Sequence, residues 1–312
     1  PTYLQPDILS RAEALGMKAR QLVEGLRVGD HKSPFKGFSV EFVQHREYVP
    51  GDDIRHIDWK GYGRSERYTI KQYEQETNFN CHLLLDASNS MRYGSGATNK
   101  LEYGKLLAAS LAYLVIRQRD SASLRVFNTK VVSELPTSSS MGHINVILKT
   151  LEAAEPRDKT TIGPLLDQVA DRIGRRGIVV LISDCLEDLE PTLAGLRHLR
   201  FRGHEVILFH VLHPDEVKFP LDGNIRFVGL EGFEELLTRP HLLRPAYLRI
   251  VNKYLADIRR GCDGSGVDYM QLLTDRPLSN ALAEYLVRRL QAARRRQRSG
   301  FGSSSQRVCL VC

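Results

Sequence analysis

Residues 81–91 read Cys-His-Leu-Leu-Leu-Asp-Ala-Ser-Asn-Ser-Met, and this stretch predicts how the rest of the chain is organised. Its three leucines are typical of a strand in a parallel sheet, where both faces are buried and hydrophobic alternation disappears. The strand ends in three oxygen donors at alternate positions, Asp86, Ser88 and Ser90. Open α/β sheets bind ligands beside the carboxyl ends of their strands, and such donors suit a hard cation. An isolated D-x-S-x-S would be explained more simply as a helix N-cap.

Two later segments favour the cation site over the cap. A threonine loop follows at residues 159–163 (Lys-Thr-Thr-Ile-Gly), and Asp184 ends a second apolar strand at residues 177–183 (Gly-Ile-Val-Val-Leu-Ile-Ser). In this order the elements resemble the metal-ion-dependent adhesion site of von Willebrand factor A domains. The spacing to Gly163 matches that family better for Thr160 than for Thr161. The resemblance therefore implies a metal site at Asp86, Ser88, Ser90, Thr160 and Asp184.

The chemistry of these donors favours recognition over catalysis. Hydroxyls bind Mg2+ without neutralising it, so an ion held by two carboxylates keeps residual positive charge and can accept another carboxylate. In the resembled family this additional ligand is an acidic side chain of a partner protein. We expect Mg2+, with Mn2+ or Ca2+ as alternatives. No general base is evident beside the site in the sequence, which predicts a protein that is not an enzyme.

The segment ahead of the first apolar strand carries a second resemblance. Residues 33–37 fit S-P-F-x-G, and residues 46–60 fit R-x-Y-x-P-G-D-D-x-R-x-I-D-W-K. Together with the strand that follows, they resemble the bacterial and archaeal domain-of-unknown-function family fifty-eight. The association of that family with MoxR-type AAA+ ATPases implies such an ATPase as a partner in protein maturation or remodelling. Asp52, Asp53 and Asp58 could form an acid/base or metal cluster, but ion pairs and Asx turns explain them better.

Composition limits the remaining possibilities. The chain has 312 residues, 42% hydrophobic, with a net charge of +7. It shows neither a run of membrane-spanning length nor a signal peptide, which predicts a cytoplasmic protein. Its five cysteines are too few and too scattered for a disulfide framework. The final Cys-Leu-Val-Cys, residues 309–312, matches a prenylation box, which we interpret as chance.

We expect three parts in the chain. Residues 1–79 should form an N-terminal helix, at residues 7–27, and a small β-rich extension. Residues 80–298 should form a Rossmann-like von Willebrand factor A domain, an α/β fold whose mostly parallel central sheet is flanked by helices. An insertion at residues 213–240 should contain a hairpin around residues 222–224, followed by a helix at residues 245–260. Residues 299–312 should form a flexible tail.

These features predict a non-enzymatic, metal-dependent protein-binding adaptor. A metal-dependent hydrolase is one alternative, and a plain scaffold whose motif survives only as helix caps is another. Nucleic-acid binding through the arginine-rich stretch at residues 288–298 is disfavoured, because no aromatic residues interleave with the arginines. Other polar residues near the site have simpler structural roles: first-turn helix acids for Glu187 and Asp188, and satisfied loop histidines for His210 and His213.

Overall fold

The computed structural model describes residues 41–48, 59, 62–63, 68–74, 79–174, 176–221, 223, 225–227, 236–238, 240–282 and 284–285. The chain divides into two compact units. A small unit lies within residues 31–79, and the main unit holds all described residues from Asn80 onward. No helix in the described ranges has both the length and the hydrophobicity of a membrane span.

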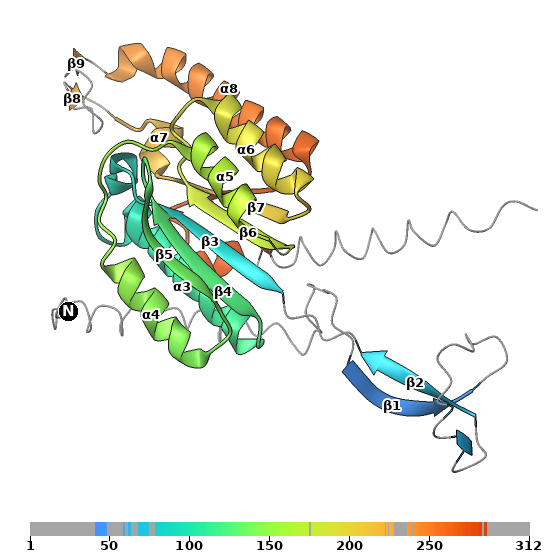
Figure 1. The fold of residues 1–312 in the computed structure, drawn as a ribbon. Coiled ribbons are helices and arrows are strands. Elements are labelled where there is room, and N and C mark those ends of the chain that lie inside the picture. The colour runs from blue at the N-terminus through green and yellow to red at the C-terminus, as the bar shows by residue number, and fades with distance from the viewer. Residues whose placement is uncertain are drawn as a thin grey trace, which may run out of the picture. The chain divides into compact units, whose positions relative to one another are not determined.

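The main unit is built around a six-stranded sheet with the strand order β10-β7-β6-β3-β4-β5 (Figure 1). All neighbouring strands are parallel except β4 and β5, which form an antiparallel hairpin. The predicted α/β fold with a mostly parallel sheet is therefore confirmed. The strands are β3 (Asn80–Asp86), β4 (Ser121–Phe127), β5 (Val131–Ser138), β6 (Gly177–Ser183), β7 (Glu205–Leu212) and β10 (Asp268–Leu273).

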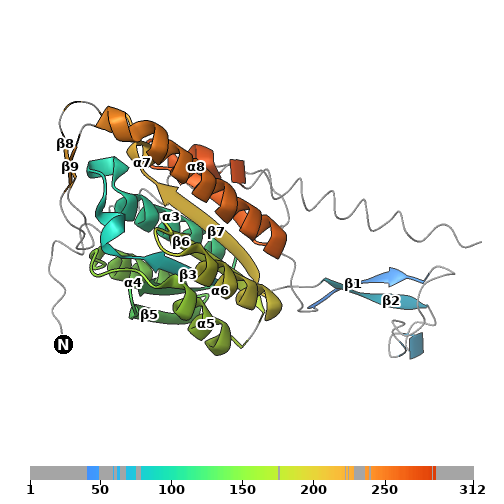
Figure 2. The same cartoon turned by 90° about the horizontal axis from the view of Figure 1, so that it is seen from above.

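Helices cover both faces of this sheet (Figure 2). On one face, α5 (Ile162–Arg172), α6 (Leu189–Phe201) and α8 (Pro240–Ser265) pack in a row over a core that includes Leu84 and Leu181. On the other face lie α3 (Lys100–Arg117) and α4 (Met141–Glu152). A Cβ added to Gly104 of α3 would lie 3.0 Å from a Leu85 methyl group. The absence of a side chain at Gly104 thus lets α3 approach the sheet closely.

β5 runs to Ser138 through Pro136, and an edge strand tolerates a proline because its outer side needs no partner. The structure differs from the sequence-based expectations at two places. α8 begins at Pro240 rather than at Pro245, which lies inside the helix and removes only one helical hydrogen bond. The hairpin of the insertion pairs β8 (Ile225–Phe227) with β9 (Leu236–Thr238), so it does not turn at residues 222–224.

The small unit contains an antiparallel pair, β1 (Glu41–Glu47) and β2 (Thr69–Glu74). The rings of Tyr62 and Tyr68 stack with centroids 4.4 Å apart, and Trp59 is 61% exposed. Several predictions lie outside the described residues: the N-terminal helix at 7–27, the acids Asp52, Asp53 and Asp58, the arginine-rich stretch at 288–298, and the tail at 299–312.

Candidate metal centre

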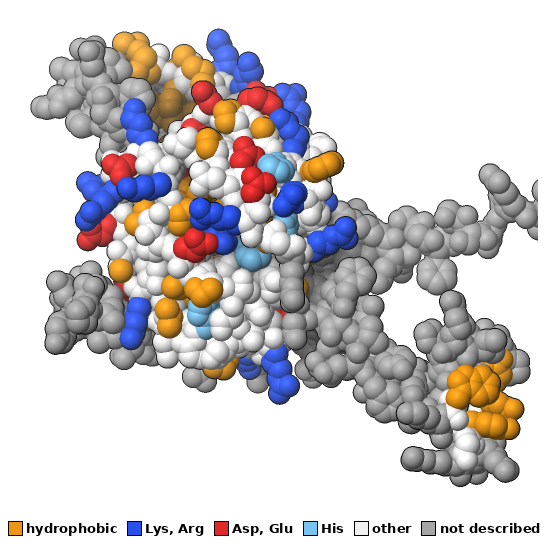
Figure 3. Space-filling model, in the orientation of Figure 1, with side chains coloured by type: hydrophobic (Ala, Val, Ile, Leu, Met, Phe, Trp, Pro, Cys, Tyr) orange, Lys and Arg blue, Asp and Glu red, His pale blue; other side chains and the backbone are white. Residues whose placement is uncertain are grey.

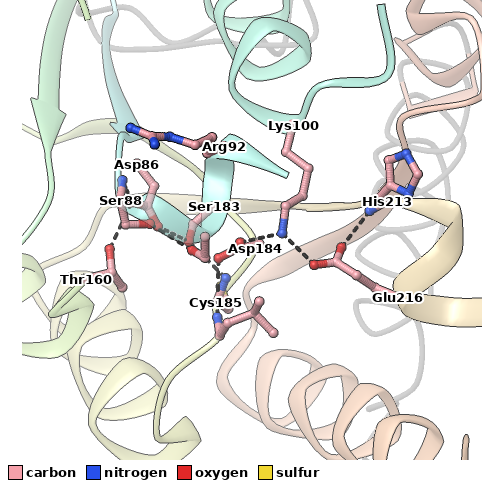
Figure 4. A network of polar contacts seen from close by, with 12 residues as sticks. Asp86, Ser88, Arg92, Lys100, Thr160, Ser183, Asp184, Cys185, His213 and Glu216 are labelled. Carbon is pink, nitrogen blue, oxygen red and sulfur yellow. Dashed lines mark hydrogen bonds and ion pairs between the residues drawn. The ribbon is translucent and has the colours of Figure 1, made fainter. Parts of the chain in front are cut away.

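The candidate site lies where β3 and β6, which are hydrogen-bonded neighbours, end side by side (Figure 4). Asp86 is the last residue of β3, and Asp184 directly follows β6. Thr160 comes from the loop that precedes α5. Both aspartates are fully buried. The carboxyl edge of the sheet therefore brings together side chains that are far apart in the sequence.

One part of the site is held by neutral hydrogen bonds to Asp86. Its Oδ1 accepts from the Thr160 hydroxyl at 2.8 Å and from the Ser88 backbone N–H at 2.9 Å. Its Oδ2 accepts from the Ser183 hydroxyl at 2.6 Å. The hydroxyls of Ser88 and Ser90 lie 2.9 Å apart. We call Asp86, Ser88, Ser90, Thr160 and Ser183 the hydroxyl half of the site.

The other part of the site is held by ion pairs. Asp184 Oδ2 accepts from the Lys100 ammonium at 2.7 Å, and Glu216 Oε1 accepts from the same ammonium at 2.6 Å. The Lys100 side chain is completely buried. Glu216 belongs to α7 (Pro214–Lys218), where its Oε2 accepts from the His213 backbone N–H at 2.7 Å. We call Lys100, Asp184 and Glu216 the ion-pair half of the site.

The two halves differ in their electrostatics. Burial, together with the nearby Asp184 carboxylate, raises the pKa of Asp86 to about 6 despite its three hydrogen bonds. Burial alone would lower the pKa of Lys100, but Asp184 and Glu216 outweigh it and hold that pKa above its ordinary value. Lys100 is therefore charged at neutral pH, whereas the donors to Asp86 in the described part of the chain are all neutral.

The threonine loop is fixed to the loop after β3. The Asn89 N–H donates to the Asp158 carbonyl at 2.8 Å, and the Arg157 N–H donates to the Ala87 carbonyl at 2.9 Å. Asp158 has a φ of +57°, a left-handed conformation that aspartate tolerates better than most residues. These two cross-links set the distance between Thr160 and the serines.

Glu187 fixes the other side of the threonine loop. Its carboxylate accepts from the Ile162 N–H at 2.9 Å, so it caps the start of α5. It also accepts from the Thr192 hydroxyl of α6 at 2.6 Å. Gly163 lies so close to α6 that an added Cβ would come within 2.8 Å of Pro191. The expectation that Glu187 is a first-turn acid of α6 is therefore wrong, because α6 begins two residues later at Leu189 and the Glu187 carboxylate caps α5 instead.

The histidines near the site have structural partners. His210 Nε2 donates to the Asp184 carbonyl at 2.8 Å, and its Nδ1 lies 2.9 Å from the Tyr269 hydroxyl. Burial lowers the pKa of His210 to about 4, so the ring is neutral and positions Asp184. The His213 ring accepts from the Asp215 N–H and so caps α7. Both are satisfied histidines, as expected, although His210 lies within β7 rather than in a loop.

The arrangement suits a small hard cation. The hydroxyls of Ser88, Ser90 and Thr160 can rotate to present lone pairs to an ion, while Asp86 supplies negative charge. Within the described residues, no group of three or more His, Cys, Asp or Glu side chains could hold a metal. A cation here would thus depend on hydroxyl oxygens. Such a set resembles an oxygen site for Mg2+ or Mn2+ far more than a zinc site.

Sequence reasoning missed three residues of the site: Ser183, Lys100 and Glu216. Ser183 could have been found, because pairing Leu85 with Ile182 places Asp86 beside Ser183 in the next row. Lys100 and Glu216 gave no signal, because a lysine at a helix start and a glutamate near a histidine are ordinary surface patterns.

Comparisons with known proteins agree with the motifs. The model of the family described as "Protein of unknown function DUF58" matches residues 44–254. The chain is 27% identical over 295 residues to the uncharacterized protein Rv1480 of Mycobacterium tuberculosis (strain ATCC 25618 / H37Rv), with 92% of each chain covered. The uncharacterized protein Mb1516 of Mycobacterium bovis matches to the same extent.

Solved structures give more distant similarities. The conserved hypothetical protein BatB from Bacteroides thetaiotaomicron aligns with a TM-score of 0.47 at 16% identity, covering 68% of this chain and 99% of that one. An aerotolerance-related membrane protein from Bacteroides fragilis aligns with a TM-score of 0.45 at 19% identity, covering 69% and 99%. The VWA domain of SpRpn10 aligns with a TM-score of 0.38 at 10% identity, covering 66% and 94%.

Proposed function

The chain belongs to the DUF58 family, as its motifs predicted, and on that premise we propose that it is a non-enzymatic adaptor. In this proposal a divalent cation at Asp86, Ser88, Ser90, Thr160 and Asp184 binds an acidic side chain of a partner protein. The observation that carries the proposal is the convergence of the hydroxyl half on one buried carboxylate. A MoxR-type AAA+ ATPase is the partner that the family resemblance suggests, and it would supply the energy of ATP hydrolysis.

The electrostatics support a cation at this place. The raised pKa of Asp86 means that burial and Asp184 disfavour its charged form, and no cationic side chain among the described residues contacts it. A divalent ion beside Asp86 would favour the charged form of the carboxylate. The charged carboxylate would in turn stabilise the bound ion. The hydroxyls around Asp86 bond to that carboxylate or to each other, so they need only rotate to become ligands.

The surface around the site supports an acidic partner. Arg92 is exposed at the end of the short 3-10 helix η2 (Asn89–Arg92), in the same loop as Ser88 and Ser90. A cation at the rim of an interface steers an acidic partner and fixes its orientation. On the face shown in Figure 3, basic and acidic side chains of the main unit are interspersed. That distribution does not suggest the broad basic footprint of a nucleic-acid-binding surface.

Calorimetry with Mg2+ and Mn2+ tests the metal site. We expect the wild-type protein to bind either ion and Asp86→Ala to bind neither. Thr160→Val should weaken binding on the order of tenfold, because it removes a ligand oxygen. Thr161→Val is the matched control and should bind like wild type, because the Thr161 side chain does not cap α5. Equal metal binding by the wild type and Asp86→Ala would contradict the proposed metal site at Asp86. If the wild type hydrolysed a generic ester or phosphodiester in a metal-dependent way and Asp86→Ala did not, the protein would be a hydrolase rather than an adaptor.

A further inference from the structure

Lys100 is a buried cation next to the proposed divalent site, and no feature of the motif accounts for it. Its side chain is completely buried, and its Nζ lies within 2.7 Å of Asp184 and 2.6 Å of Glu216. Burying an ammonium group is unfavourable unless carboxylates pair with it, so the two acids are needed to hold the charge inside. Asp184 thus serves two sites at once, as the partner of Lys100 and as a proposed neighbour of the divalent ion.

Sharing Asp184 changes the charge that an incoming ion meets. Asp184 Oδ2 is engaged by Lys100, and its Oδ1 has only a long contact of 3.4 Å with the Leu186 N–H. Oδ1 therefore retains lone pairs that an ion could use, but much of the negative charge of the carboxylate is already neutralised. Among the described residues, no cation balances the other aspartate of the site, Asp86. A divalent ion would keep most of its positive charge and be repelled by Lys100 across Asp184.

We propose that Lys100 makes binding of the divalent ion depend on a third carboxylate, which the partner protein supplies. This inference rests on the proposed function and specifies how the same site is regulated. The ion alone is held weakly because Lys100 offsets Asp184. When an acidic side chain joins the ion, the added negative charge compensates for Lys100, and ion and partner stabilise each other.

Glu216 sets how strongly Lys100 acts. It lies on the side of the ammonium away from the divalent site, and its second oxygen is held by the capping box of α7. Glu216 offsets part of the charge of Lys100, so removing the charge of Glu216 should strengthen the repulsion. Removing the charge of Lys100 should abolish that repulsion and strengthen binding of the ion. Neither side chain is a proposed ligand of the ion, so opposite effects would identify a charge mechanism.

The experiment titrates Mg2+ into the full chain by calorimetry, with and without millimolar amounts of a blocked pentapeptide that has a central glutamate. The same peptide with glutamine is the control. We expect the glutamate peptide to raise the Mg2+ affinity of the wild type at least tenfold. Lys100→Met should bind Mg2+ alone at least tenfold more tightly than wild type and lose most of the peptide dependence. Glu216→Gln should bind Mg2+ alone several-fold more weakly and show a larger peptide effect.

A buried lysine on the same helix provides the matched control. Lys105 pairs with Glu102 at 2.9 Å and does not contact the site, so Lys105→Met should leave Mg2+ affinity unchanged. If Lys100→Met does not fold, the weaker binding and larger peptide effect of Glu216→Gln still test the proposal. The proposal is overturned if the wild type binds Mg2+ equally with either peptide, or if Glu216→Gln strengthens binding. A wild type that binds no Mg2+ even with the glutamate peptide would overturn the proposed function as well.

Discussion

The two halves of the candidate site are buried to a similar degree but are stabilised in different ways. In the hydroxyl half, Asp86 is held by one backbone N–H and two hydroxyls, all of them neutral. In the ion-pair half, Asp184 and Glu216 are held by a full positive charge on Lys100. Within the residues that the structure describes, Lys100 neutralises charge in the ion-pair half, whereas no cationic side chain contacts Asp86 in the hydroxyl half. The difference suggests that stability and ligand binding are divided between two neighbouring carboxylates.

The largest expected effect is the loss of the ion-pair half. With chelator present, Lys100→Met should lower the free energy of unfolding by about 3–5 kcal/mol, because it leaves the buried Asp184 without its cation. Urea denaturation followed by circular dichroism measures this change. Lys105→Met should lower the free energy of unfolding by less, since Glu102, the partner of Lys105, is half exposed. Equal losses in the two variants would show that the ion-pair half contributes no more stability than a surface pair.

A smaller effect, of opposite sign, should come from the hydroxyl half. The folded-state pKa of Asp86, about 6, exceeds its ordinary value of 3.8. Its protonated form therefore stabilises the fold at acidic pH, and this contribution is lost as the pH rises through about 6. In chelator, Asp86→Asn should gain stability relative to wild type between pH 4 and pH 7, by up to about 3 kcal/mol at about 1.4 kcal/mol per pKa unit.

The difference in the free energy of unfolding between the wild type and Asp86→Asn separates the titration of Asp86 from that of other groups. Burial lowers the pKa of His82 and of His210 to about 4, so the stability linked to these rings is lost as the pH falls from 6.5 to 4. Both histidines are present in both proteins and largely cancel in the difference. Urea denaturation across this pH range gives the two curves, and excess Mg2+ should restore the stability of the wild type at pH 7. If the free energies of unfolding of the wild type and Asp86→Asn changed with pH in parallel, the raised pKa of Asp86 in the folded protein would be contradicted.

The smallest effect should come from the cap that holds the threonine loop. Glu187→Ala should lower the free energy of unfolding by about 1 kcal/mol, because the Ile162 N–H at the start of α5 loses its acceptor. It should also weaken Mg2+ binding a few-fold, because Thr160 would be held less firmly. Thermal denaturation and calorimetry measure the two effects. Glu190→Ala, which removes a largely exposed ion pair with Arg197, is the control and should change neither. Similar results for both variants would show that the cap does not position the loop.

Much of the central sheet could be predicted from the sequence because its strands are short apolar runs bounded by polar residues. The bounds predicted for β6, residues 177–183, agree with the structure at both ends. Four members of the hydroxyl half could be anticipated: Asp86, Ser88 and Ser90 end an apolar strand at alternate positions, and Thr160 precedes Gly163 at the spacing of the resembled family. Ser183 was not anticipated. The hydrogen bonds of Asp86 to Ser88 and Thr160 bring together residues that the motif already named.

Lys100 and Glu216 of the ion-pair half could not be predicted, because their place in the site depends on contacts between distant segments. Lys100 lies 84 residues from Asp184 and 116 residues from Glu216 along the chain. A lysine that follows Asn99 at the start of an amphipathic helix is normally exposed, and only the packing of α3 against the sheet buries it. The start of α8 differs from the prediction for a local reason: a proline favours the first turn of a helix, but α8 accommodates Pro245 in its interior.

Pro136 in β5 has a consequence for how copies of this protein meet. β5 forms one edge of the sheet, and its register against β4 shifts between the pairs Ala122–Ser138 and Leu124–Leu135. Proline has no N–H to donate, and the irregular register bends this end of the strand. An added strand would find an interrupted row of hydrogen bonds along this edge. Filament growth by edge-to-edge strand addition is therefore disfavoured at β5.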